Sequence, residues 1–402
     1  MLHQRMSIIP HCGVILSKFS INRVLAQQNV GPVLNERGKN SKITTINLMR
    51  FLNIVLNNLI WFLVFSAFVF FSIASDRFLN PVTISNILIS ISALGFLVLS
   101  QSYTFITGNF DLSVESTLAF TAMVAALLII SAENGGLDIG LHYVWAILLM
   151  LVIGIKIGLF NGYLITKVKV NNLIVTIAML FLLRGLTYGI SPGTTVSFFP
   201  DGFRWLGNDS ILKFGIEGFR GKLVIPVSGL VVTLAFLLAY FHTKYTQFGR
   251  NMYAIGADKE IARNNGINVD RTVIIVYMIA GLCAAIAGII IAGRLNSATP
   301  TMGHGIIFTV HAAAIIGGMS IYGGRGNVIG AFGGVLLWAI LDTGLNIMRV
   351  SPFWIEVSRG LLLLLAVLIE AIRNKYQQRI LTINKFSRSK VGQEDQFYWK
   401  YS

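Results

Sequence analysis

Residues Phe248 to Gly266, FGRNMYAIGADKEIARNNG, form a polar segment between two long apolar runs of the chain. Asp is a residue type that caps helices, so Asp258 predicts a short helix over Lys259 to Asn264 that stops at Gly266. Its residues alternate between small and charged, so this helix is not expected to bury an apolar face on its own chain. We predict that it docks on a separate protein; the alternative is an ordinary solvated loop with one helical turn.

The rest of the chain has the composition of an integral membrane protein. Of its 402 residues, 54% are hydrophobic and only 12% are charged, whereas soluble domains carry about 25% charged residues. A net charge of +15 would favour nucleic acid as the partner of a soluble protein. Here the placement of the basic residues decides its meaning, and we expect a lipid bilayer and no nucleic acid.

Apolar windows of about twenty residues, the length that crosses a bilayer, recur along the chain. They cover residues 51–74, 84–106, 112–131, 142–160, 172–190, 223–241, 273–292, 305–321, 326–347 and 353–373. We therefore expect an all-α, polytopic transmembrane bundle of about ten helices. The windows at 84–106 and 305–321 are the weakest of the ten.

The distribution of basic residues predicts the orientation and the domain boundaries. If the N-terminus lies inside, the connections that share its side, together with both chain ends, hold most of the 32 Lys and Arg residues. Cytoplasmic loops carry this excess, so both termini are expected in the cytoplasm. We divide the chain into a basic N-terminal extension at 1–45, a transmembrane domain at 46–375 and a basic tail at 376–402.

Small residues recur at four-residue spacing in several windows, a pattern that lets neighbouring helices approach closely. We expect the resulting stripes to pack helices, with pore lining as the alternative. The glycines concerned are Gly154, Gly158, Gly162, Gly326, Gly330 and Gly334.

Two Arg-Gly pairs, at Arg184 and Arg359, occupy similar depths in the fifth and tenth windows. This correspondence suggests two related halves of five helices with opposite topology. The alternative is that both arginines extend to the outer interface as snorkelling side chains.

Polar residues inside the windows are few, and they suggest a path for a solute. Asp111 and Ser113 open the third window, where they either line a polar path or only cap a helix near the surface. Glu115 lies one turn beyond Asp111, so the two acids could also form a proton site. Asn172 opens the fifth window, and Asn346 lies one turn beyond Asp342 in the ninth. Each amide could contact a hydroxylated solute or bond a neighbouring helix.

The sequence carries no motif for catalysis. It lacks a G-x-x-x-x-G-K-[ST] phosphate loop, a cluster with metal-ligand spacing and a nucleophile elbow. Its cysteines, Cys12 and Cys283, have no partner pattern. We expect no catalytic residue, no metal and no cofactor in this polypeptide, and hence no enzymatic activity.

Four ordered motifs between about residues 45 and 375 resemble the permease subunits of bacterial ABC importers of the ribose/monosaccharide class. That family includes autoinducer-2 permeases and is more distantly similar to branched-chain amino-acid permeases. The matching pieces are GNFDLSVES at Gly108 to Ser116, the stretch Val170 to Tyr188, the segment Phe248 to Gly266, and IGGMSIYGGRGNVIG at Ile316 to Gly330, followed by Ser351 to Trp354.

The resemblance implies a multi-pass protein of the bacterial inner membrane. It implies a dimer with a second permease copy or a paralogue, two cytoplasmic ATPase subunits that bind ATP and Mg, and a periplasmic solute-binding protein. It also implies that a cytoplasmic helix transmits ATPase motion. By position, the residues assigned to that ATPase-coupling segment are Gly249, Arg250, Tyr253, Gly256, Glu260, Ala262, Arg263 and Gly266.

The chain departs from the family pattern at a few positions. Asn109 and Glu115 stand where the family has glycine, and Ile307 and Thr309 stand where it commonly has acids. These departures are compatible with a changed substrate or with pairing to a different permease.

The favoured function is the translocation path of an ATP-driven importer for a sugar or a similar hydroxylated solute, with Asp111, Ser113, Asn172 and Asn346 as pathway residues. A secondary carrier that couples protons through Asp111 and Glu115 is the alternative. A passive channel is less favoured, because the sequence shows no selectivity motif.

Overall fold

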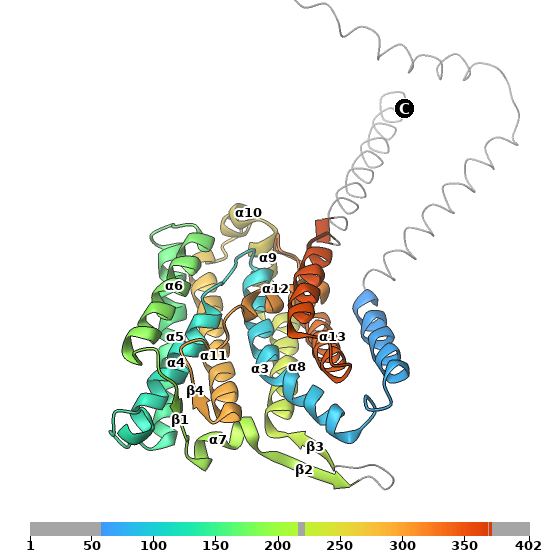
Figure 1. Cartoon of the computed structure of the whole chain (residues 1–402). Helices are drawn as coiled ribbons and strands as arrows, with labels where there is room; N and C mark the ends of the chain where they lie inside the picture. The colour runs from blue at the N-terminus through green and yellow to red at the C-terminus, as the bar shows by residue number, and fades with distance from the viewer. Residues whose placement is uncertain (1–57, 216–221, 369, 372–402) are drawn as a thin grey trace, which may run out of the picture. The chain divides into compact units, whose positions relative to one another are not determined.

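The computed structural model describes residues 58–215, 222–368 and 370–371. The predicted extension at 1–45 and the tail at 376–402 lie outside the described residues, so both stay predictions. The described residues are mostly helical, in agreement with a helical membrane bundle (Figure 1).

Among the described residues, six helices are long and apolar enough to cross a membrane. They are α3 (Pro81–Ile106), α5 (Tyr143–Thr166), α6 (Asn172–Ile190), α8 (Val227–Tyr245), α11 (Val269–Leu295) and α13 (Val328–Ile347). Three shorter apolar helices are Asn58–Ala74, α4 (Val114–Ile129) and α12 (Ile306–Ile316). Residues 352–368 are also helical. Every predicted window thus overlaps a helix, whereas the number of ten membrane crossings stays a prediction.

The helix α12 is shorter than the window predicted at 305–321. Its 11 residues span about 16 Å, roughly half of a bilayer core. Gly317 caps its C-terminal end, and Gly318 follows with a φ of 89°. This left-handed conformation ends the helix, and the chain then turns toward α13.

Helix starts in the bundle follow ordinary capping chemistry. Asn80 accepts a hydrogen bond from Val82 N at 3.0 Å at the start of α3, where Pro81 takes the first helical position. Asn171 accepts from Leu173 N at 2.9 Å at the start of α6. Polar residues at these window edges therefore mark where helices begin.

Helix α11 packs against α3, α4 and α5 and against the short helix α7 (Asp201–Asn208). Its contact with α5 is made by glycines. An added Cβ at Gly154 would lie 2.4 Å from Gly281 O, one at Gly158 would lie 2.0 Å from Tyr277 O, and one at Gly162 would lie 2.8 Å from Ile274 Cα. The two backbones therefore touch along most of the stripe.

A second glycine contact joins α13 to α12. An added Cβ at Gly330 would lie 2.2 Å from Gly317 O, and one at Gly334 would lie 1.9 Å from Ala313 O. Gly326 lies before the start of α13, next to the side chain of Met319. It therefore lies in the connection before α13 and not on the helix face, where we had predicted it.

Short elements lie at the two ends of the bundle (Figure 1). One end holds α9 (Gln247–Ala257) and α10 (Lys259–Asn264), and α8 leads from the other end to them. That other end holds α7, η1 (Ala132–Asn134), an antiparallel pair of β1 (Val196–Ser197) and β4 (Ser297–Ala298), and a hairpin of β2 (Ser210–Gly215) and β3 (Lys222–Pro226). The two small sheets were not expected in an all-α chain. Strands β1, β2 and β4 form in connections between the apolar windows, and β3 takes up the first residues of the window at 223–241.

The glycine contact between α5 and α11 predicts a loss of stability on substitution. Gly158→Ala should destabilise the bundle by about 1–3 kcal/mol, since its methyl group overlaps Tyr277 O and the helices must separate. Gly185→Ala is the control, because an added Cβ there meets no atom within 4 Å. Thermal unfolding in detergent, followed by size exclusion, should show a lower midpoint for Gly158→Ala only; equal midpoints would refute the packing assignment.

Candidate functional site

Three segments that are distant in sequence meet at the end of the bundle that carries α9 and α10. Gly324 N donates a hydrogen bond to Ile106 O at 2.9 Å. An added Cβ at Gly256 would lie 1.9 Å from Ile106 O and 2.3 Å from Gly324 N, and one at Gly323 would lie 2.6 Å from Gly108 Cα. We call Gly108, Gly256, Gly323 and Gly324 the glycine junction, since their backbones meet with no side chain between them.

The glycine junction joins three of the four sequence motifs. Gly108 begins GNFDLSVES, Gly256 lies within the Phe248 to Gly266 segment, and Gly323 and Gly324 lie in IGGMSIYGGRGNVIG. Gly108, Gly323 and Gly324 have φ values of 69°, 84° and 69°, a region that side chains rarely adopt. Both the left-handed backbone and the close approach therefore require glycine here.

Helix α9 is fixed to the bundle at two further points. An added Cβ at Gly249 would lie 2.1 Å from Thr243 O of α8. The Tyr253 hydroxyl donates to Gly326 O at 3.0 Å, and burial raises the pKa of this phenol, which therefore remains a neutral donor. Arg250 lies on the exposed side, where its guanidinium donates to Gln247 Oε1 at 2.6 Å.

Helix α10 forms as predicted. Asp258 accepts hydrogen bonds from Glu260 N and Ile261 N, both at 2.9 Å, which confirms its role as the cap. Gly266 follows the helix with a φ of 80°. Ala262 is buried and packs against Ile255 and Val273, so the expectation that the helix buries nothing apolar on its own chain is wrong at this residue.

The outer surface of α10 combines apolar and charged residues. Glu260 and Arg263 are exposed, and Ile261 between them is 60% exposed. Arg263 contacts Asp270 at 3.3 Å, and Asp270 in turn contacts Lys167 at 3.0 Å. Arg263 is therefore paired within its own chain, whereas Ile261, which sequence reasoning missed, offers an exposed apolar surface to a partner.

A cavity of about 300 Å³ lies against α10. The ammonium of Lys259 and the amide of Asn172 both donate to Asn109 Oδ1, each at 3.4 Å. Asn109 is one of the positions where this chain departs from the family pattern. The contact connects α10 to the loop after α3 and to the start of α6.

Asp111 and Ser113, two of the predicted pathway residues, contact one another in the structure. Asp111 Oδ1 accepts from Ser113 N at 2.9 Å and from Ser113 Oγ at 2.6 Å. Asn161 of α5 donates to Ser113 Oγ at 2.9 Å. Both residues are buried, so they order the loop that starts α4.

Asn346, another predicted pathway residue, lies apart from them on α13, where its amide donates to Asp342 O at 2.6 Å.

Glu115 and Arg184 form a buried ion pair with a distance of 3.2 Å. Arg184 also donates to Pro300 O at 2.7 Å and to Met302 O at 2.9 Å, and Glu115 Oε2 accepts from Ile307 N at 3.3 Å. The pair thus ties α4 and α6 to the chain that enters α12. Arg184 is 8% exposed, so the alternative that this arginine snorkels to the outer interface is wrong.

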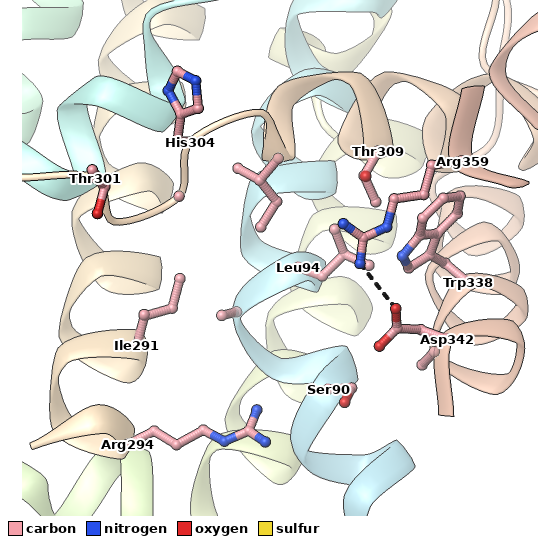
Figure 2. A pocket seen from close by; sticks show the side chains of 14 residues that line it. Ser90, Leu94, Ile291, Arg294, Thr301, His304, Thr309, Trp338, Asp342 and Arg359 are labelled. Atoms are coloured by element: carbon pink, nitrogen blue, oxygen red, sulfur yellow. Dashed lines mark hydrogen bonds and ion pairs between the residues drawn. The ribbon is translucent and has the colours of Figure 1, made fainter. Parts of the chain in front are cut away.

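A second cavity, of about 410 Å³, lies between α3, α11, α12, α13 and the helix at 352–368 (Figure 2). Asp342 Oδ1 and the Arg359 guanidinium face each other in this cavity at 3.0 Å. Sequence analysis noted both charges, but not that they meet, because they belong to different helices. Within the part of the chain that the structure describes, no group of three or more metal-ligating side chains is present.

The chain was compared with known proteins, and its residues 83–368 match the family model described as branched-chain amino acid transport system / permease component. The chain belongs to this permease family. Its apolar helices agree with an integral membrane protein that serves as a transport component. No solved structure matches the chain significantly.

Several curated relatives are similar along most of their length. The ribose import permease protein RbsC of Bacillus subtilis is 36% identical over 300 residues, which cover 74% of this chain and 88% of that protein. The xylose transport system permease protein XylH of Escherichia coli is 31% identical, with 75% and 88% covered. The galactose/methyl galactoside import permease protein MglC of Haemophilus influenzae is 32% identical, with 75% and 90% covered.

The glycine junction predicts that Gly256→Ala disturbs the permease locally. Its methyl group would overlap Ile106 O, so α9 must move away from α3 at a cost of about 1–3 kcal/mol. Limited proteolysis should then cut the segment around α9 and α10 faster than in the parent. Gly189→Ala on α6 is the control, since an added Cβ there meets no atom within 4 Å; equal cleavage in both variants would contradict the junction.

The buried ion pair predicts an asymmetric response to substitution. Arg184→Leu leaves the Glu115 carboxylate buried without its partner, which should cost about 3–5 kcal/mol and lower the yield of folded permease. Replacing both residues by leucine should recover part of this loss, because no charge remains buried. Folded yield and unfolding midpoint in detergent measure both effects, and a double variant no better than Arg184→Leu would argue against the pairing.

Proposed function

We propose that this permease forms the translocation path of an ATP-driven importer for a monosaccharide or a similar small hydroxylated solute. The observation that carries the proposal is the similarity to ribose, xylose and galactose permeases over about three quarters of the chain. The four motifs noted in the sequence resemble those of the same class of permease. Three of these motifs meet in the glycine junction.

The proposed setting is a bacterial inner membrane with both termini in the cytoplasm. The excess of Lys and Arg on one side supports this orientation. It places α9 and α10 in the cytoplasm, next to ATPase subunits that bind ATP and Mg. The end with α7 and the β2–β3 hairpin then faces a periplasmic solute-binding protein. A second permease copy or a paralogue completes the assembly.

The contacts of α9 and α10 suggest how motion of an ATPase reaches the membrane. A force on α10 passes to α9, with which it is packed. Because Gly256 touches the end of α3 and Gly324 directly, α9 cannot move without displacing the two connections that lead to α4 and α13. Lys259 adds a second link through Asn109. These connections would rearrange helices around the solute path, as alternating access requires.

The secondary-carrier alternative gains no support from the structure. Both Glu115 oxygens have partners, Arg184 and Ile307 N, and Asp111 is bonded to Ser113. Glu115 is therefore held within the fold by both of its oxygens. The relatives named as import permeases further favour ATP-driven transport over this alternative and over a passive channel.

The proposal is tested by affinity isolation from a native host, followed by uptake of labelled ribose, xylose and galactose into membrane vesicles. We expect an ATPase subunit to co-purify and uptake to follow ATP and not a proton gradient. A chain that purifies alone, with uptake that collapses with the gradient, would contradict the importer and favour the proton-coupled carrier.

The exposed apolar residue on α10 gives a prediction for ATPase docking. Ile261→Asp places a carboxylate where a partner would cover an apolar side chain, and it should lower ATPase co-purification by about tenfold or more. The control is Asn264→Asp, which adds the same charge at an exposed position of the same helix. Equal ATPase recovery with both variants would exclude Ile261 from the contact.

A further inference from the structure

The cavity between α3, α11, α12, α13 and residues 352–368 has the size and lining of a binding site. Its volume of about 410 Å³ falls within the range of small-molecule sites, about 300–1,000 Å³. Residues from all five helices and from the connection before α12 line it (Figure 2). Such a site between transmembrane helices is where a transported solute would be held.

Two charges lie at this cavity on helices that we predict to cross the membrane. Asp342 is on α13, and Arg359 is in the helix at 352–368, where it also contacts Glu356 Oε1 at 2.5 Å. Charged side chains at membrane depth are unfavourable, and they commonly mark the path of a solute. Arg359 Nε is buried and meets no acceptor among the described residues.

Uncharged polar groups and one aromatic ring complete the lining. The hydroxyl of Thr309 and the indole of Trp338 lie beside the Asp342–Arg359 pair, and Thr301 and His304 lie across the cavity (Figure 2). Trp338 is 8% exposed, so its ring forms part of the wall. A sugar ring presents hydroxyl groups along its edge and C–H groups on its face, and this lining offers donors, acceptors and an aromatic surface for both.

The charges indicate which solutes fit. Asp342 and Arg359 cancel one another, and the further cation Arg294 at the cavity disfavours cationic solutes. We propose that this cavity binds a neutral, polyhydroxylated solute during transport, with Asp342, Arg359 and Thr309 hydrogen-bonded to its hydroxyls and Trp338 against its ring. This inference rests on the proposed function and adds the place where the solute is held.

The simplest competing explanation for this ion pair is structural: Asp342 and Arg359 only connect α13 to the helix at 352–368. The uncharged Thr309 separates the two explanations, because it lies outside the ion pair. Thr309→Val keeps the shape of the side chain and removes one hydroxyl. Thr233→Val on α8 makes the same change at an exposed position outside the cavity, where the hydroxyl donates to Gly229 O of its own helix at 2.8 Å.

The test measures ATP-driven uptake of ribose, xylose and galactose by the complete importer in vesicles. Thr309→Val and Asp342→Asn should each lower the uptake of the transported sugar by at least about tenfold, since a site built for hydroxyls loses a partner. ATPase co-purification with each variant should match that with Thr233→Val, which shows that the importer is assembled. Uptake by Thr309→Val equal to that of Thr233→Val would overturn the site while leaving the importer intact. A parent that transports none of the three sugars would overturn both the sugar class and the site.

A second measurement does not depend on turnover. Ser90→Cys, in a chain whose Cys12 and Cys283 are replaced by serine and alanine, places a thiol on the α3 wall of the cavity. The transported sugar should slow its labelling by a small, charged methanethiosulfonate reagent. Asn264→Cys on exposed α10 should be labelled equally with and without sugar. Labelling of Ser90→Cys that the transported sugar leaves unchanged would refute binding in this cavity.

Discussion

The fold depends on direct contact between backbones where side chains would not fit. At the glycine junction, Gly256 of α9 lies against the carbonyl of Ile106 and against Gly324. Packed interiors transmit displacement because they have little free volume. Here no flexible side chain lies between the moving parts. The same principle holds α5 against α11 through Gly154 and Gly158, so the bundle is rigid where it must carry force.

Charges inside the bundle serve two different purposes. Glu115 and Arg184 are buried, and their remaining hydrogen bonds go to backbone groups around the start of α12, so this pair fixes the fold. Asp342 and Arg359 are only partly buried and face a cavity. Both pairs avoid an isolated charge in the membrane. Only the second pair leaves room for a solute beside it.

Local signals in the sequence predicted local structure well. The Asp258 cap and the span of α10 depend on neighbouring residues alone, and all ten apolar windows contain helices. Contacts across the bundle were not predictable in the same way. Glu115 and Arg184 are separated by 69 residues, and only the packing of α4 against α6 brings them together. The apolar pattern likewise did not predict the left-handed Gly318, which ends α12 inside the window at 305–321. It also did not predict the two small sheets, one of which pairs β1 with the distant β4.

The central claim is that motion of α10 reaches the solute path through the glycine junction. It is tested most directly by a spin label at Thr301, which lines the proposed solute cavity, in the importer assembled with its ATPase. ATP should change the mobility of this label in the parent and leave it unchanged in Gly256→Ala. An equal ATP response in the two proteins would show that the coupling follows another route.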